Sequence, residues 1–212
     1  MTNQETFWAG DFGQQYTDRN TRDRADWDTF YRANWGLTKA DINARFCADW
    51  PRDYRILEVG CNTGMQLRGL QDAGFTDLYG IELQYYAVEQ AKQATQHINI
   101  IQGSGFDLPF RDDYFDVVVT NGVLIHISPD DLPRLMAEMV RVSRRFIWGF
   151  EYFADSLTEI PYRGNTGFLW KADYAKLFLA QHSDLQEVRR ELFPYVSAAE
   201  SGNVDCMYLL TK

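Results

Sequence analysis

The 212-residue sequence has few cysteines and a shortage of positive charge. Its 3 cysteines, Cys47, Cys61 and Cys206, include no CxxC pair, which argues against a disulfide framework or a structural zinc site. We interpret them as reduced core thiols. Lys and Arg number 21 against 30 Asp and Glu, and the net charge of -9 disfavours a nucleic-acid partner. No His, Cys, Asp or Glu cluster has metal-ligand spacing, so we expect no metal.

Long apolar runs are also absent. Stretches such as DVVVTNGVLIHI are too short to span a bilayer, and the polar start MTNQETFWAGD does not resemble a signal peptide. We therefore expect a cytoplasmic protein with no membrane partner. The 45% hydrophobic content suits one globular domain over residues 1–212.

What is present is an alternation of apolar, strand-like runs with helical patterns. Such alternation predicts a parallel sheet with helices on both faces. Two later runs, 184–193 and 204–211, would add an antiparallel hairpin. The predicted fold class is α/β, with a Rossmann-like, seven-stranded, mostly parallel sheet whose last strand is antiparallel. The earlier strands are expected at 54–59, 78–82, 98–102, 115–120 and 145–150, with helices near 63–73, 84–95 and 130–142.

Two segments lie outside this alternation. Residues 1–50 are rich in aromatic and charged side chains without strand periodicity, which predicts an N-terminal helical cap. Within it, Thr38 and Asp41 begin a helix that we expect to run to Trp50, before Pro51. Residues 151–183 contain EYFADSLTEIPYRGNTGFLW, and so long a connection is expected to be a lid or a substrate loop.

Acidic residues stand at the ends of the first two predicted strands. In RILEVGCNTG, Glu58 precedes a turn with Gly60 and Gly64 that leads into a helix, a geometry that lets a ligand approach the backbone. Glu82 follows Gly60 by 22 residues and could accept the hydroxyls of a ribose. Each acid also has a plain structural interpretation: Glu58 as an exposed strand end, and Glu82 as the cap of the helix starting at Gln84. A carboxylate in the first turn would repel a pyrophosphate, so a nucleoside that carries a positive group fits better.

These motifs resemble those of the class I S-adenosylmethionine (SAM) dependent methyltransferases. The match consists of EVGCNTG for the first motif, GIEL for the ribose motif, GSGFDLPF for the adenine motif and FDVVVTNGVLIHI for the fourth strand. The sequence departs from the class at Asn62, where the class has its middle glycine, and at Ser104, where the class has an acid. The resemblance implies SAM as the cofactor, with Gly60 and Gly64 beside the methionine part, Glu82 at the ribose, Ser104 and Phe106 at the adenine, and Asn121 near the methionine end. The further cofactor-binding residues that we expect are Glu58, Asn62 and Leu83.

A narrower resemblance covers the ends of the chain. FWAGDFGQQYTDRN, GVLIHI, EYF and YRG are similar to methyltransferases associated with pseudaminic acid biosynthesis. This implies an acidic amino sugar, or its nucleotide-linked precursor, as the small-molecule substrate. Tyr162 and Arg163 would then bind the substrate, with Arg163 as partner of a carboxylate. Arg163 is equally compatible with a solvated loop residue.

Aromatic residues are expected to surround the sulfonium of SAM, because a fixed cation is attracted to ring faces. Packing of the cap onto the sheet explains any one of these rings equally well. His126 fits a structural histidine as well as a base and is given no catalytic role. The expected cup consists of Trp8, Phe12, Tyr16, Tyr152, Tyr162 and Trp170. We predict catalytic roles for Tyr16, Asn121 and Tyr152.

Three functions are compatible with these features. The first is an enzyme that transfers the SAM methyl group to an oxygen or nitrogen of a small molecule. The second is a SAM cyclase, in which the α-amine of SAM attacks its own γ-carbon to give azetidine-2-carboxylate and methylthioadenosine. The third is a SAM-binding module without catalysis. The pattern does not predict an oligomeric state.

Overall fold

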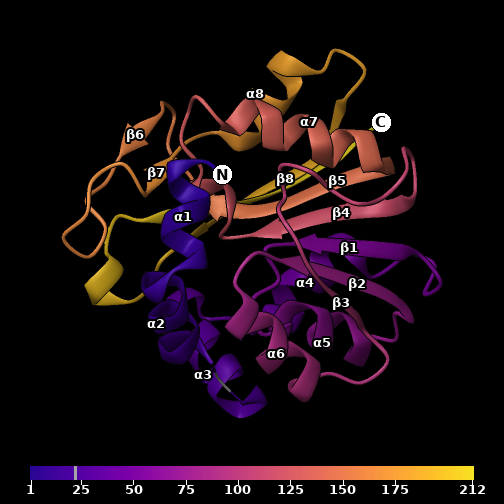
Figure 1. Cartoon of the computed structure of the whole chain (residues 1–212), viewed down its shortest axis with the longest axis horizontal. Helices are drawn as coiled ribbons and strands as arrows, with labels where there is room; N and C mark the ends of the chain where they lie inside the picture. The colour runs from indigo at the N-terminus through magenta and orange to yellow at the C-terminus, as the bar shows by residue number, and fades with distance from the viewer. Residues whose placement is uncertain (22) are drawn as a thin grey trace.

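A computed structural model describes residues 1–21 and 23–212 of the chain (Figure 1). Over these residues, no helix is long and apolar enough to cross a membrane. The helices are α1 (Asn3–Ala9), α2 (Asp11–Asn20), α3 (Arg24–Trp35), α4 (Lys39–Cys47), α5 (Met65–Asp72), α6 (Tyr85–Ala94), α7 (Leu132–Val142) and α8 (Tyr174–Gln181), with short 3-10 turns η1 (Leu124–His126) and η2 (Ala198–Glu200). The strands are β1 (Arg55–Val59), β2 (Asp77–Glu82), β3 (Asn99–Gln102), β4 (Phe115–Asn121), β5 (Ser143–Tyr152), β6 (Thr158–Glu159), β7 (Trp170–Lys171), β8 (Gln186–Pro194) and β9 (Val204–Thr211).

The central sheet has seven strands in the order β3-β2-β1-β4-β5-β9-β8. Strands β1 to β5 pair in parallel, and β9 runs antiparallel to both β5 and β8. This confirms the predicted fold class, including the antiparallel last strand. Because parallel strands end at one edge, the residues that follow β1, β2 and β4 meet there. The start of β9 lies at the same edge, since Asp205 pairs with Tyr152 at the end of β5.

The sheet separates two buried cores, because successive strand residues point to opposite faces. Leu57 and Val118 face α7 and α8, whereas Ile56 and Val117 face α4 and α5. Figure 1 shows these helix pairs on the two sides of the sheet. The strands buried on both faces thus explain the continuous apolar runs in the sequence. All three cysteines are buried and unpaired, as expected for core thiols.

The N-terminal residues form helices, as predicted for the cap. In Figure 1, α1 and α2 lie across the carboxyl ends of the parallel strands. The helix beginning after the Thr38–Asp41 capping box ends at Cys47, so the expected extension to Trp50 is wrong. The reason is the Arg52 guanidinium, which donates to the carbonyls of Cys47 and Ala48 and so satisfies the end of the helix early.

The expected 151–183 loop is shorter than predicted. Tyr152 belongs to the end of β5, and the C-terminal part of the segment is helix α8. Asp173 caps α8 by accepting from the Lys176 backbone N–H, and Phe178 is fully buried against the sheet. Only residues 153–173 connect β5 to α8, and they include the β6–β7 ribbon.

Replacing Phe178 by alanine tests whether α8 belongs to the core. We expect the free energy of unfolding to fall by about 3–5 kcal/mol, because a fully buried ring leaves a cavity. Lys176→Ala, an exposed position on the same helix, is the control and should change it by less than about 0.5 kcal/mol. Urea unfolding of both variants gives the comparison. Equal losses would show that α8 is a loosely attached cover.

Candidate functional site

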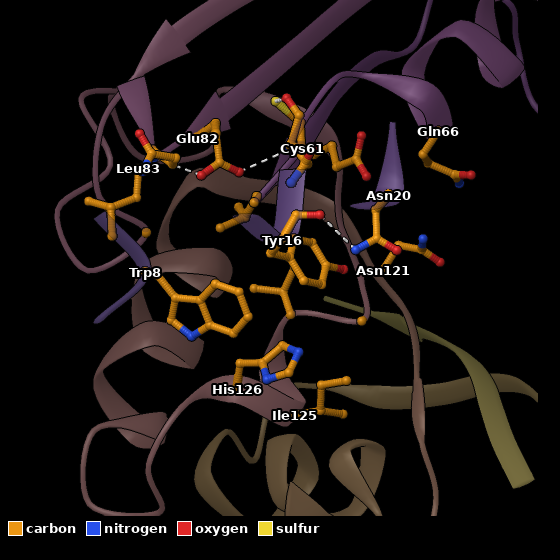
Figure 2. Close-up of a pocket in the computed structure, with 18 of the residues that line it drawn as sticks. Trp8, Tyr16, Asn20, Cys61, Gln66, Glu82, Leu83, Asn121, Ile125 and His126 are labelled. Carbon is orange, nitrogen blue, oxygen red and sulfur yellow. Dashed lines mark hydrogen bonds between the residues drawn. The ribbon is translucent and has the colours of Figure 1, made fainter. Parts of the chain in front are cut away.

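A cavity of about 410 Å³ lies at the carboxyl edge of the parallel strands. Figure 2 shows Trp8, Tyr16 and His126 gathered on one side of it and Glu82 with Cys61 on the other. Gly64 does not line the cavity, because at this position the chain begins α5 and turns toward Thr95. The sequence-predicted residues that do line it are Tyr16, Glu58, Gly60, Asn62, Glu82, Leu83, Ser104, Phe106, Asn121, Tyr152, Tyr162 and Arg163.

The turn after β1 forms one wall of the cavity. Gly60 has φ +72°, and a Cβ there would lie 2.7 Å from a Val123 methyl carbon, so only glycine fits without movement. Asn62 also has a positive φ of 44°, and its side-chain oxygen accepts from the Thr63 N–H at 2.8 Å. This local hydrogen bond explains how asparagine occupies a place where the class has glycine.

Glu82 is anchored at the end of β2 by the backbone. One carboxylate oxygen accepts from the Asn62 N–H at 2.9 Å and the other from the Gln84 N–H at 2.8 Å. Burial raises the pKa of Glu82, and these N–H donors pull it back only in part. A carboxylate has about four acceptor directions, so capacity for a ligand remains beside these backbone donors. The interpretation of Glu82 as the cap of the following helix is wrong, because Gln84 is the N-cap of α6 and its side chain accepts from the Tyr86 N–H.

A second carboxylate, that of Glu5, lies beside Ser104 and was not identified from the sequence. The Ser104 hydroxyl donates to Glu5 of α1 at 2.6 Å, and the Phe106 N–H donates to the same hydroxyl oxygen at 3.1 Å. Burial raises the pKa of Glu5, but the hydrogen bonds from Ser104 and Thr2 outweigh it, so the net pKa is lowered. An ionised acid therefore lines the cavity beside Ser104, although it comes from the N-terminal helix.

The roof of the cavity, defined here as α1, α2 and residues 153–173, is fixed to the sheet by polar contacts. Gln84 donates to the carbonyls of Ala9 and Gly10, both at 3.0 Å, and Asn62 donates to the Thr17 hydroxyl at 3.2 Å. Within the roof, the rings of Phe7 and Phe168 stack with centroids 3.8 Å apart. The two parts of the chain that sequence analysis assigned to a cap and a lid therefore meet above one site.

The expected aromatic cup is only partly assembled. Trp8 and Tyr16 have ring centroids 5.2 Å apart, and Tyr162 and Tyr152 also line the cavity. Two rings of the predicted cup, Phe12 and Trp170, do not line it. Phe12 packs 4.1 Å from Phe7 inside the roof, and Trp170 is buried on β7.

His126, whose role the sequence left undecided, lies beside the aromatic cup. Its ring centroid is 4.5 Å from that of Trp8, and its Nδ1 is 2.8 Å from the Phe168 carbonyl oxygen. A carbonyl only accepts, so Nδ1 carries the proton and donates. Burial lowers the pKa of His126 to about 4, which keeps the ring neutral at physiological pH. The contact with Phe168 gives this histidine a structural role in holding the roof.

Lys39 is a buried cation that sequence analysis missed. Its ammonium donates to the Asn121 side-chain oxygen at 2.8 Å and lies 4.0 Å from the centroid of the Phe150 ring. Burial lowers the pKa of Lys39 to about 7, although Glu58 opposes this shift. Because the ammonium occupies the Asn121 oxygen, the amide N–H groups of Asn121 are the donors left for the cavity.

Three buried acids surround this cation. Burial raises the pKa of Glu58 well above its ordinary value and raises the pKa values of Glu151 and Asp205 to about 7. Glu151 accepts from the Val123 N–H at 3.2 Å. One oxygen of Glu58 has no hydrogen-bond partner within the part of the chain that the structure describes. Glu58 is therefore not the exposed strand end that one interpretation allowed, since only 3% of its surface is exposed.

The site shows no arrangement suited to a metal. Across residues 1–21 and 23–212, no group of three or more His, Cys, Asp or Glu side chains is placed to hold one. The acids at the cavity are instead hydrogen-bonded to backbone N–H groups or lie near Lys39. Such carboxylates can accept from hydroxyl or ammonium groups of an organic ligand.

The family model described as a methyltransferase domain matches residues 57–145, which include the turn after β1, Glu82, Ser104 and Asn121. This part of the chain is therefore similar to a methyltransferase domain. Magnesium protoporphyrin IX methyltransferase of Synechocystis PCC 6803, solved with bound SAH (S-adenosylhomocysteine), has a similar fold. The TM-score is 0.71 at 13% identity, covering 98% of this chain and 97% of that one, a likeness of fold alone.

Two curated methyltransferases are similar to this chain over part of its length. The 2-phytyl-1,4-naphtoquinone methyltransferase of Trichormus variabilis is 32% identical over 94 residues, 41% of this chain and 40% of that protein. The phthiotriol/phenolphthiotriol dimycocerosates methyltransferase of Mycobacterium leprae is 29% identical over 157 residues, 71% of this chain and 53% of that protein. With an uncharacterized Haemophilus influenzae protein included, the chain matches only 38% to 53% of the length of these relatives.

Because of the buried acids, we expect the stability of the protein to depend on pH. The pKa of Glu151 is 4.5 when unperturbed and about 7 in the fold, so ionisation favours the unfolded chain. Stability should therefore fall as pH rises from 4.5 to about 7. Glu151→Gln cannot ionise, and we expect it to remove up to about 3 kcal/mol of that fall.

Urea unfolding at pH 5 and pH 8 measures this effect. Asp184→Asn, at an exposed position, is the matched control and should keep the wild-type difference between the two pH values. An equal difference in wild type and Glu151→Gln would disprove the assignment to Glu151.

Proposed function

We propose that this protein is an enzyme that binds SAM in the cavity and transfers its methyl group to a small molecule. The observation that carries the proposal is the geometry of Glu82. Its partly buried carboxylate stands beside the glycine turn at the carboxyl edge of a parallel sheet and keeps acceptor capacity for a ligand. Carboxylate oxygens in that place suit the paired hydroxyls of a ribose.

The remaining walls of the cavity fit the other parts of SAM. The missing Cβ of Gly60 lets a ligand approach the chain, and the unpartnered oxygen of Glu58 can accept from an ammonium group. At the opposite end, Glu5 and Ser104 offer polar atoms to the adenine, with the buried Phe106 ring beside them. In this proposal Glu5 replaces the acid that the class carries at the Ser104 position.

When bound, SAM supplies a methyl group that is activated by its sulfonium. The protein then has to orient an acceptor and exclude water. The roof performs the exclusion, and Trp8, Tyr16 and Tyr152 supply ring faces for the positive charge. Asn121 is held by Lys39 so that its amide donors face the ligand. Burial raises the pKa of Tyr152 to about 12, so Tyr152 acts as a neutral hydroxyl.

An acidic amino sugar, or its nucleotide-linked precursor, is the acceptor that we propose from the narrower resemblance. Arg163 supports this choice, because it is exposed, has a positive φ of 48° and lines the cavity at its mouth beside Tyr162. A guanidinium in that place can bind a carboxylate in two-pronged fashion. The roof contacts leave the ring of Tyr162 facing the cup, 5.2 Å from His126.

Cyclisation of SAM is a second candidate, favoured by the unpartnered oxygen of Glu58 near the expected position of the SAM amine. Incubation with SAM alone, followed by mass spectrometry, separates the two functions. Methyl transfer leaves SAM unchanged until an acceptor is added. Formation of methylthioadenosine and azetidine-2-carboxylate would establish the cyclase.

Glu82→Ala should weaken the binding of both SAM and SAH by about 2–4 kcal/mol, because the ribose loses two charge-assisted acceptors. Glu82→Gln keeps the shape and one acceptor, and its loss should be smaller. Glu89→Ala on α6, outside the cavity, is the control and should bind as wild type does. Titration calorimetry measures all three. Wild-type affinity in Glu82→Ala would remove the basis of the proposed function.

Tyr16→Leu tests the aromatic cup through the charge of the ligand. We expect SAM affinity to drop about 2- to 30-fold, whereas the affinity for SAH, which lacks the sulfonium charge, should change less. Tyr85→Leu, at an exposed tyrosine outside the cavity, should affect neither. Competition binding with the two ligands gives the ratio. An equal loss for SAM and SAH would mean that Tyr16 only packs the cap onto the sheet.

A further inference from the structure

One part of the cavity is lined by four aromatic rings and one carboxylate. We call this part the aromatic chamber and define it by Tyr31, Trp35, Tyr152, Tyr195 and Asp205. All five residues line the cavity. Trp35 lies 4.6 Å from the Tyr31 ring and 4.7 Å from the Tyr195 ring, and the Tyr152 and Tyr195 centroids are 5.8 Å apart. These rings come from α3, β5 and the segment after β8, so the chamber exists only in the folded chain.

Asp205 is the acid of this chamber. It is 4% exposed and pairs with Tyr152 across the β5–β9 ladder, which places it at the carboxyl edge of the sheet. The Tyr195 hydroxyl donates to it and the Trp35 indole N–H faces it, and both lower its pKa. The Trp35 N–H reaches full hydrogen-bond geometry with no partner in the described residues, and both it and the carboxylate belong to residues that line the cavity.

The charges around the chamber favour a cation. Glu58, Glu151 and Asp205 act on the same buried ammonium, that of Lys39, which is thus outnumbered by acids. A second cation in the chamber would reduce the cost of burying these carboxylates. Ring faces on several sides also attract a cation, whereas a neutral alcohol would gain neither effect.

We propose that the chamber holds a primary amine of the acceptor, with its nitrogen beside Asp205, and that this nitrogen is the atom methylated. The inference rests on the proposed function and identifies the class of its acceptor. Asp205 takes one proton from the ammonium, which breaks an N–H bond, forms a carboxyl O–H bond and frees the nitrogen lone pair. The nitrogen then bonds to the methyl carbon as the carbon–sulfur bond breaks, and that electron pair stays on sulfur.

Two matched pairs of probes test the amine without knowledge of the natural acceptor. D-glucosamine differs from D-glucose, and 2-phenylethylamine from 2-phenylethanol, by an amine in place of a hydroxyl. In the SAH-saturated protein at pH 7.5, we expect at least one amine to bind about tenfold or more tightly than its alcohol by ligand-observed NMR. Asp205→Asn should bring that amine to the affinity of the alcohol, and Asp184→Asn should not.

The outcomes separate this inference from the proposed function. Unchanged SAH affinity in Asp205→Asn together with loss of amine preference supports the chamber assignment. If SAH binds but both amines fail to exceed their alcohols, or if Asp205→Asn keeps the preference, the inference is overturned and SAM binding stands. If wild type does not bind SAH, the proposed function itself fails.

A second variant avoids removal of the buried charge. Tyr195→Phe takes away the hydrogen bond that lowers the pKa of Asp205, so that pKa should rise above about 7. Amine affinity requires the ionised carboxylate and is lost as pH falls through its pKa, so the loss should begin at higher pH in Tyr195→Phe. Lys39, Glu151 and Tyr195 also face this carboxylate, and the first two are unchanged in the variant. Coincident pH profiles for the two proteins would contradict the role of Asp205.

Discussion

The cost of taking carboxyl groups out of water is the constraint on which this site depends. Three buried acids and the partly buried Glu82 lie around the carboxyl edge of the sheet, and they are compensated in three ways. Glu82 and Glu151 accept hydrogen bonds from backbone N–H groups, and Asp205 accepts one from a tyrosine hydroxyl. The positive charge of Lys39 stabilises the ionised form of Glu58. The compensation is incomplete, since the pKa values of all four remain raised. A cationic ligand would complete it, which is why the proposed cofactor and acceptor are both positively charged.

Topology explains how so many acids come together. Parallel strands deliver Glu58, Glu82 and Glu151 from the ends of β1, β2 and β5 to one edge. The reversed direction of β9 adds a residue from the beginning of a strand, Asp205, to the same edge. The N-terminal helices then cover the opening, and α4 brings Lys39 beneath it. No segment of the sequence holds the site by itself.

The sheet and half of the site were predictable because they depend on local patterns. Apolar runs located the strands to within two residues, and the glycine turn together with Glu82 indicated the cofactor wall. The other half depends on contacts that no local pattern contains. The position of Glu5 in the site follows from its hydrogen bond with Ser104, which is distant in the sequence. Lys39 has the sequence pattern of an exposed residue at the start of a helix, and only its contacts with Asn121 and Phe150 show that it is buried at the site. The helix at Tyr174–Gln181 was missed although Asp173 marks its start, because the aromatic segment before it suggested a single loop.

Helix α1, at the entrance to the cavity, has one further consequence. With 7 residues it is too short to persist by itself in water, and its order derives from Glu5 on Ser104, Gln4 on the Gly167 carbonyl and Phe7 on Phe168. A molecule bound beneath α1 would be partly covered by these attachments. In the proposed function, release of spent cofactor past α1 would require them to loosen, a local opening of the kind that can limit the rate of successive cycles.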